Sequence, residues 1–146
     1  MGIKDPFNMG AAMAPAAVDT IAAHLRDFKL DASYYDLIVT GDLGRVGSEI
    51  AKELFIKHQM TVDLAKYNDC GLMIYDLNKQ MVQSGGSGCG CSAGVTYGHL
   101  LKLLRKGDLQ RILVVATGAL LSPLSFQQGE SIPCIAHAVA IENKEE

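Results

Sequence analysis

The sequence predicts an α/β fold with a mixed, mostly parallel sheet and helices packed against it. Two short apolar runs, residues 35–41 and 111–118, each close on a glycine and have the composition of strands buried on both faces. Segments with apolar residues at helical spacing separate these runs, as crossovers between parallel strands require. A last apolar run, residues 135–141, follows a polar loop over residues 122–133 that has no predicted helix, so we expect it to pair antiparallel with the strand before it.

A helix is predicted over residues 15–28. Pro15 suits the first turn of a helix, where a missing N–H costs nothing. The apolar residues that recur at helical spacing are Ala17, Ile21, Leu25 and Phe28. Residues 8–14 are rich in small side chains, and they fit either a tight buried loop or an extra helical turn.

The order of the elements predicts an incomplete fold. Parallel sheets ordinarily open with a strand that leads into the first helix, so a chain that opens with a helix is expected to lack the first strand. We therefore expect residues 1–142 to form half of a larger fold, followed by a charged tail over residues 143–146. At 146 residues with 49% hydrophobic content, the chain still has enough apolar side chains for a buried core.

The middle of the chain alternates turns with helices. The first strand runs into a turn over residues 41–44, and the helix after it has apolar residues at Val46, Ile50, Leu54 and Phe55. Residues 61–76 show no regular pattern, so we expect them to be mostly irregular. A further helix is predicted over residues 92–106, with basic residues in its last turns and Gly107 as its stop signal.

Composition and charge exclude several classes of protein. The formal net charge of −3 argues against a general nucleic-acid-binding surface, which needs a basic face. No run of about 18 apolar residues is present, so no membrane span is predicted. The first residues lack the apolar core of a signal peptide, and a cytoplasmic location is expected.

Four cysteines are present, at positions 70, 89, 91 and 134. Without a secretion signal, reduced thiols are expected. Cys89 and Cys91 form a Cys-x-Cys pair, which does not match the paired spacing of zinc sites, so no metal site is predicted.

Residues 83–92 form a glycine-rich segment, with glycines at positions 85, 86, 88 and 90. Glycine permits positive φ angles and close approach of the backbone to another group. The segment precedes a helix whose free N–H groups attract anions, although it lacks the Gly-Lys-Ser/Thr ending of a P-loop. Contact with a ligand and a tight turn packed against a neighbouring part of the protein both fit this pattern.

Three further residues are candidates for a site. Asp42 follows the carboxyl end of a predicted parallel strand, where ligands gather in open α/β sheets, but a helix-capping role fits it equally. Cys89 lies near a helix start that would lower the pKa of its thiol, yet no cysteine–histidine spacing supports a nucleophile. His137 alternates with apolar residues on a strand, and a histidine buried in the core is the preferred interpretation.

The loops together resemble those of the carboxy-terminal half of the thiolase fold. Residues 9–16 are similar to the Met-Gly-x-Gly-Pro-x-Pro-Ala segment before the first helix of that half. Residues 36–42 fall where thiolases carry a strand that ends in Asn-Glu-Ala-Phe, and residues 86–93 fall where they carry Gly-His-Pro-x-Gly. Longer strings resemble the stage V sporulation protein AD family of spore-forming bacteria: residues 37–44, 85–93, 118–125 and 127–138.

The departures from thiolases concern the residues of catalysis. Ser87 stands at the thiolase histidine position, and Gly41-Asp42 replaces the Asn-Glu pair. Cys134 lies near the second thiolase cysteine but lacks the Cys-x-Gly signature, and the nucleophilic cysteine of these enzymes belongs to their amino-terminal half. The resemblance therefore implies no catalytic residue and no cofactor in this chain.

What the resemblance implies is a non-catalytic, ligand-binding half of a sporulation protein involved in the uptake of dipicolinic acid (pyridine-2,6-dicarboxylic acid) into the forespore. The thiolase pocket lies between the two halves of the fold. The residues expected to line one wall of it are Asp42, Gly86, Ser87, Gly88, Cys89 and His137. The alternatives are an acyltransferase of the thiolase or ketoacyl synthase type and a structural assembly subunit.

The resemblance also implies partners and a location. The expected partners are the amino-terminal half of the same fold, the dipicolinic acid dianion and other membrane-associated stage V sporulation proteins. Self-association is expected as well, because an isolated half exposes the surface that meets its mate. The expected location is the cytoplasm of the forespore or mother cell, including the surface of the spore inner membrane.

Overall fold

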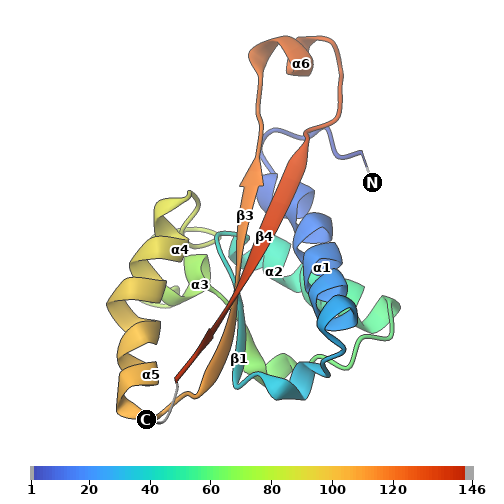
Figure 1. Cartoon of the computed structure of the whole chain (residues 1–146). Helices are drawn as coiled ribbons and strands as arrows, with labels where there is room; N and C mark the ends of the chain where they lie inside the picture. The colour runs from blue at the N-terminus through green and yellow to red at the C-terminus, as the bar shows by residue number, and fades with distance from the viewer. Residues whose placement is uncertain (1, 144–146) are drawn as a thin grey trace.

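The computed structural model describes residues 2–143, which form a four-stranded sheet with helices on both faces (Figure 1). The strands are β1 (Leu37–Thr40), β2 (Tyr67–Asp69), β3 (Arg111–Ala119) and β4 (Cys134–Glu142). They lie in the order β2-β1-β3-β4, with β1 parallel to β2 and β3, and β4 antiparallel to β3. This sheet confirms the predicted α/β class. Apart from Asn143, the predicted charged tail lies outside the described residues.

Helix α1 (Met9–Phe28) starts six residues before the predicted helix. The side chain of Asn8 caps it by accepting a hydrogen bond from the Ala11 N–H at 3.2 Å. Of the two interpretations of residues 8–14, the extra helical turn is therefore the one that the structure shows. The small residues allow α1 to cross the helix that contains Gly47 at close range. A Cβ placed on Gly47 would lie only 2.6 Å from the Gly10 carbonyl oxygen, which is too close for any larger residue.

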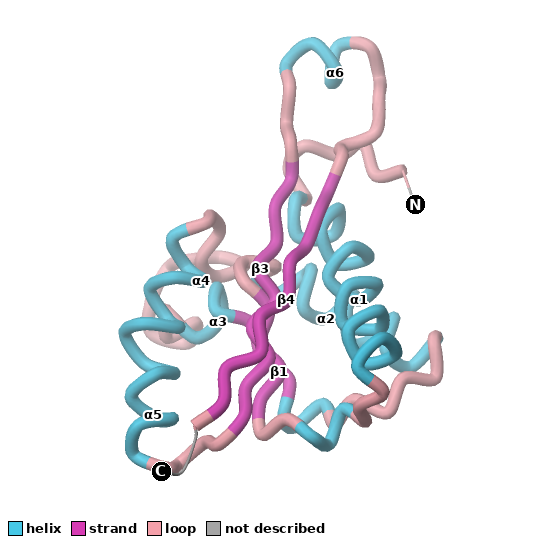
Figure 2. Tube along the Cα trace, viewed as in Figure 1, coloured by secondary structure: helices cyan, strands magenta, loops and turns pink. Residues whose placement is uncertain are grey.

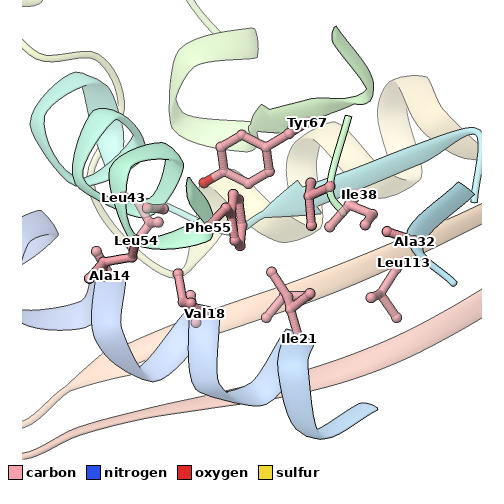
Figure 3. Close-up of a cluster of buried hydrophobic side chains, with 14 of the residues drawn as sticks. Ala14, Val18, Ile21, Ala32, Ile38, Leu43, Leu54, Phe55, Tyr67 and Leu113 are labelled. Atoms are coloured by element: carbon pink, nitrogen blue, oxygen red, sulfur yellow. The ribbon is translucent and has the colours of Figure 1, made fainter. Parts of the chain in front are cut away.

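The main hydrophobic core lies between the sheet and the pair α1 and α2 (Gly44–Lys57) (Figure 3). Val18 and Ile21 of α1 and Phe55 of α2 point toward Ile38 of β1 in this core. The ring of Phe55 meets Tyr67 of β2 edge-on, with centroids 5.1 Å apart. Ile38 of β1 and Leu113 and Val115 of β3 face this cluster, so one face of the sheet anchors both helices.

The other face of the sheet is covered by a continuous helical rod. It consists of α4 (Gly90–Val95), a π-helical segment η3 (Thr96–Leu100) and α5 (Leu101–Lys106). Leu100 and Leu104 pack there against Val39 and Ile112, in a second core cluster. The predicted stop at Gly107 is confirmed, because this residue has the left-handed φ of +79°.

The prediction of an irregular segment over residues 61–76 is wrong. This segment holds a short 3-10 turn η2 (Leu64–Lys66), the strand β2 and the one-turn helix α3 (Cys70–Met73). β2 has only three residues, and two of them are polar, so it leaves no apolar run in the sequence. Its backbone pairs with β1 over the whole of its length, which is what makes it a strand.

The β3–β4 hairpin extends beyond the rest of the molecule (Figures 1 and 2). Its antiparallel pairing is confirmed by a continuous register from Arg111 opposite Glu142 to Ala119 opposite Cys134. The expectation that the connecting loop has no helix is wrong, since α6 (Pro123–Gln127) lies at its tip. Pro123 stands in the first turn of α6, where proline is favoured.

None of the helices in the described part of the chain combines the length and the apolar character that a membrane crossing requires. Its longest helix, α1, has 20 residues. The polar side chains Asp19, His24 and Arg26 all lie within that helix.

Candidate functional site

The carboxyl ends of the three parallel strands meet at one edge of the sheet, where ligands of open α/β folds ordinarily bind. Short turns lead there from β1 into α2 and from β2 into α3. The glycine-rich loop of residues 83–89 lies against both turns. Two backbone hydrogen bonds of 2.7 Å hold it in place, one from the Arg45 N–H to the Ser84 carbonyl and one from the Gly86 N–H to the Gly71 carbonyl.

Asp42 joins the end of β3 to the glycine-rich loop. Its carboxylate accepts a hydrogen bond from the Thr117 hydroxyl, with 2.5 Å between the oxygens, and another from the Gly88 N–H at 3.1 Å. The side chain is largely buried, with 8% of the residue exposed. The capping interpretation of Asp42 does not hold, because no side chain of the β1–α2 turn caps α2.

The residue that sequence analysis missed is Asp69, at the end of β2. Its fully buried carboxylate accepts four hydrogen bonds. The donors are the Thr40 hydroxyl at 2.7 Å and the backbone N–H groups of Leu43 at 2.9 Å, Gly44 at 3.0 Å and Gly71 at 3.0 Å. Asp69 therefore fastens the β1–α2 turn to the β2–α3 turn. Its one sequence signal is its place directly before the break at Cys70-Gly71.

Burial controls the ionisation of this cluster. It raises the pKa of Asp69, and the hydrogen bonds from Thr40 and the turn backbone oppose that rise. It also raises the pKa of Tyr67 to about 12. The Thr40 hydroxyl has one proton, which its shortest contact assigns to Asp69, so the Tyr67 hydroxyl donates to Thr40 over 3.0 Å.

The conformation of the loop explains its glycines. Gly85 and Gly88 have φ angles of +102° and +133°, which other residues rarely adopt. A Cβ on Gly86 would lie 2.7 Å from the Cys91 sulfur. The sequence-based expectation of positive φ angles and a close approach is thus confirmed at these three positions, and the close contacts are with this chain itself.

A cavity of about 580 Å³ opens beside these turns. Three segments line it: residues 5–10 from the start of the chain, residues 42–44 from the β1–α2 turn, and residues 82–87 from the glycine-rich loop, with Val46 of α2 beside them. Three of the predicted site residues are in this lining, namely Asp42, Gly86 and Ser87. Gly88 reaches the same place through its hydrogen bond to Asp42.

The charge of the cavity lining is negative. Asp5 and Asp42 are its two charged residues, and no lysine or arginine is among the lining residues described. Asp5 is exposed, and its carboxylate accepts a hydrogen bond from the Phe7 N–H at 3.0 Å. The two carboxylates make the cavity unfavourable for an anion unless cations are supplied from outside this chain.

The structure does not place Cys89 and His137 in the cavity lining. Cys89 is exposed just before α4. The prediction of a buried core histidine is wrong, because His137 is exposed on β4, opposite Ala116 of β3. Ile135 and Val139, on the same face of β4, are also more than half exposed, so the helical rod leaves this end of the sheet uncovered.

The remaining thiols are poorly suited to nucleophilic chemistry. Burial raises the pKa of Cys70 to about 12 and also raises the pKa of Cys91 and Cys134. A thiol with a raised pKa holds little of the reactive thiolate at neutral pH. Over residues 2–143, no three histidine, cysteine, aspartate or glutamate side chains gather in a way that could hold a metal ion.

Comparison with known proteins identifies the family. The family model described as "Stage V sporulation protein AD (SpoVAD)" matches residues 1–142. A curated relative, stage V sporulation protein AD of Bacillus subtilis (strain 168), is 56% identical over 142 residues, which are 97% of this chain and 41% of that protein. The chain thus spans less than half the length of the relative that it matches. From its sequence, the chain belongs to the stage V sporulation protein AD family.

Proposed function

We propose that this chain provides one wall of a small-molecule site whose other wall is the amino-terminal half of a thiolase-like fold. The observation that carries this proposal is the open cavity at the carboxyl edge of the parallel strands, lined by Asp42 and the glycine-rich loop. The ligand is dipicolinic acid, bound without catalysis during its uptake into the forespore. Gly88 and Cys89 lie beside this wall, and His137 lies within β4, opposite Ala116 of β3.

The electrostatics of the cavity support a shared site. Dipicolinic acid is a dianion at neutral pH, and the lining described here contains two carboxylates and no cation. The N–H groups of Gly86 and Gly88 are already bonded to Gly71 and Asp42. Binding therefore requires lysine or arginine side chains from the facing half, while this chain provides shape, hydroxyl groups such as Ser87, and the exposed start of α4.

The proposal places the protein in an assembly. Its further partners are other membrane-associated stage V sporulation proteins, and its location is the forespore or mother cell, at the surface of the spore inner membrane. The match of this chain to 41% of its relative supports a partner half, because the remaining length is available to form one.

A structural assembly role is a second candidate, and one observation favours it. The glycine-rich loop makes its close contacts with this chain itself, at Gly71 and Cys91. Such a loop can hold the two turns together without meeting a ligand. An acyltransferase has less support, because burial disfavours the thiolate of Cys70 and Cys91.

Calorimetric titration of dipicolinic acid distinguishes these functions. The chain is titrated alone, and then mixed with the amino-terminal portion of the Bacillus subtilis relative, with sedimentation showing that the two associate. Saturable heat in the mixture alone is the expected result. Association without heat would overturn the ligand proposal and favour the structural role, and turnover of a thioester by the mixture would favour the acyltransferase.

A further inference from the structure

β4 is an edge strand of the described sheet, and the hydrogen bonds beyond its ends show which backbone groups face outward. The Leu120 N–H donates to the Pro133 carbonyl, and the Asn143 N–H donates to the Gln110 carbonyl. Odd-numbered residues of β4 therefore bond to β3, because antiparallel pairing alternates from residue to residue. The even-numbered residues, from 134 to 142, direct their N–H and C=O groups to the free edge.

Two contacts confirm the direction of these groups. The Ile132 N–H, just before β4, donates to the Ile3 carbonyl at 2.9 Å on this outer side. The Ala136 carbonyl accepts a hydrogen bond from the Thr20 hydroxyl of α1 at 3.2 Å. Both groups belong to even-numbered residues, as the pairing requires.

Up to its last residue, Glu142, the free edge lacks the features that ordinarily block strand addition. Residues 134–141 contain no proline, lysine, arginine or acidic residue, and they run for most of a nine-residue strand without a bulge. Natural sheets protect such edges with charges, prolines or bulges. The side chains of Ala136, Ala138 and Ala140 are small, so a neighbouring backbone can approach.

Space for a second strand lies beside the carboxyl-terminal half of β4. A cavity of about 380 Å³ is lined by Ala138, Ala140 and Glu142 of β4 and by His24 and Phe28 of α1, with Tyr34 and Tyr35 below. Phe28 is 68% exposed at this rim. The end of α1 thus lies beside the edge across this cavity, whereas its middle contacts the edge at Ala136 through Thr20.

We propose that two copies of this chain associate through β4, which extends each sheet into one continuous antiparallel sheet across a two-fold axis at Ala138. In this register Ala138 faces Ala138 of the second copy, Ala136 faces Ala140, and Cys134 faces Glu142. Because all of these residues are even-numbered, each pair exchanges N–H and C=O groups, and the Ala136 carbonyl keeps its bond from Thr20 on its second lone pair.

The side chains in this register are self-complementary. Glu142 is the one charged residue of β4, and it meets Cys134, so no like charges oppose each other. On the other face of the sheet, exposed Ile135 meets Ile141, and exposed Val139 meets His137. The small side chains of one copy enter the cavity beneath α1 of the other, and apolar surface is removed from water on both faces.

Sedimentation equilibrium over a hundredfold range of concentration tests the proposal, with Ala138→Pro as the main variant. Proline at an outward-facing N–H removes a donor from the interface and leaves the pairing with β3 intact. Ala138→Ser, which keeps the N–H, is the matched control. We expect a dimer for the wild type and for Ala138→Ser, a monomer for Ala138→Pro, and the same far-ultraviolet circular dichroism for all three.

A second measurement does not depend on how the proline variant folds. With Cys89 and Cys134 changed to serine, Ala138→Cys places one thiol at the two-fold axis, where directly paired Cα atoms lie about 5.5 Å apart and a disulfide can form. Oxidation should yield a linked dimer, whereas Ser125→Cys at the hairpin tip should not. A monomer at every concentration would overturn the proposal. So would protection of the Ala138 amide from hydrogen exchange that appears only on mixing with the amino-terminal portion of the relative, because that portion and not a second copy would then cover β4.

Discussion

Two aspartates at the carboxyl edge of the sheet, Asp42 and Asp69, have different surroundings and different consequences. Asp69 is fully buried with four donors on its two oxygens, and Asp42 has two donors and borders the open cavity. Because all the acceptor sites of the Asp69 carboxylate are occupied, it has none left for a ligand, and its role is to hold the two turns together. Sequence analysis identified Asp42 as a site residue but missed Asp69, which holds the turn that contains Asp42 in place.

Replacing Asp69 should destabilise the protein more than replacing Asp42. In Asp69→Asn, the new NH₂ group must face two N–H or O–H donors, so we expect a loss of about 3 kcal/mol in the free energy of unfolding. In Asp42→Asn, the amide oxygen can still accept from Gly88 while the NH₂ group donates to the Thr117 hydroxyl, so the loss should be about 1 kcal/mol or less. Urea denaturation measures both, and equal losses would contradict the assigned roles.

Asp36 should make stability depend on pH. Its carboxylate accepts hydrogen bonds from the N–H groups of Arg111 at 2.9 Å and Gln110 at 2.8 Å, and these bonds lower its pKa below 3.8. A lowered pKa means that this stabilisation is complete above pH 3.8 and is lost as pH falls through the folded-state pKa. Asp36→Ala should cost about 2 kcal/mol at pH 7. Denaturation at a series of pH values measures the difference in the free energy of unfolding between wild type and Asp36→Ala. If that difference stays the same below pH 3 as at pH 7, the linkage is contradicted.

At the scale of elements, the sequence predicts well what repeated apolar spacing specifies. The strands β1, β3 and β4 and the stop at Gly107 follow from apolar runs and a glycine. β2 escapes prediction because its three residues are held by pairing with β1, which lies far away in the sequence. The start of α1 and the helix α6 depend on local capping by Asn8 and Ser122, a weak signal in short polar segments.

The crossing of α1 and α2 gives a prediction at this scale. A Cβ on Gly10 would collide with the Leu43 carbonyl oxygen, so Gly10→Ala should destabilise by about 2 kcal/mol. Gly94→Ala is the matched control, because its Cβ would meet only the end of the Ile74 side chain at 3.8 Å. That change should stabilise the protein by about 0.5 to 1 kcal/mol through helix propensity. Thermal unfolding checks both, and a neutral Gly10→Ala would show that the helices cross less closely.

At the scale of the whole molecule, the proposed function requires a second part that completes the site. The chain spans 41% of its Bacillus subtilis relative, its cavity lies open, and the lining carries only negative charge. Sequence analysis identified the family from its resemblance to long strings of residues. It also identified Asp42, Gly86 and Ser87 of the cavity lining, because a strand end and a run of glycines indicate loops that approach a ligand. It could not reach the charge of the lining, because that depends on how residues 5–10 fold back over the turns.

Removing the exposed acidic group should strengthen the binding of a dianion. Asp5→Asn keeps an acceptor for the Phe7 N–H and deletes one negative charge from the cavity lining. In the complex with the amino-terminal portion of the relative, we expect the affinity for dipicolinic acid to rise by a few fold at low salt and by less at high salt, because ions screen exposed charges. Unchanged affinity at low salt would place the ligand away from Asp5. Asp108→Asn is the control, because Asp108 is exposed and precedes the amino end of β3, opposite the carboxyl ends that border the lining.

The central claim is that the Asp42 turn and the glycine-rich loop form the ligand-facing wall of this half. Its most direct test is a nitrogen-15 NMR titration of the labelled chain, in complex with the unlabelled amino-terminal portion of the relative, with dipicolinic acid. We predict that the amide shifts of residues 42–44 and 83–90 change with ligand while those of β4 at Ala138 do not. Saturable binding that leaves residues 83–90 unchanged, or that moves only residues outside this edge of the sheet, would contradict the account.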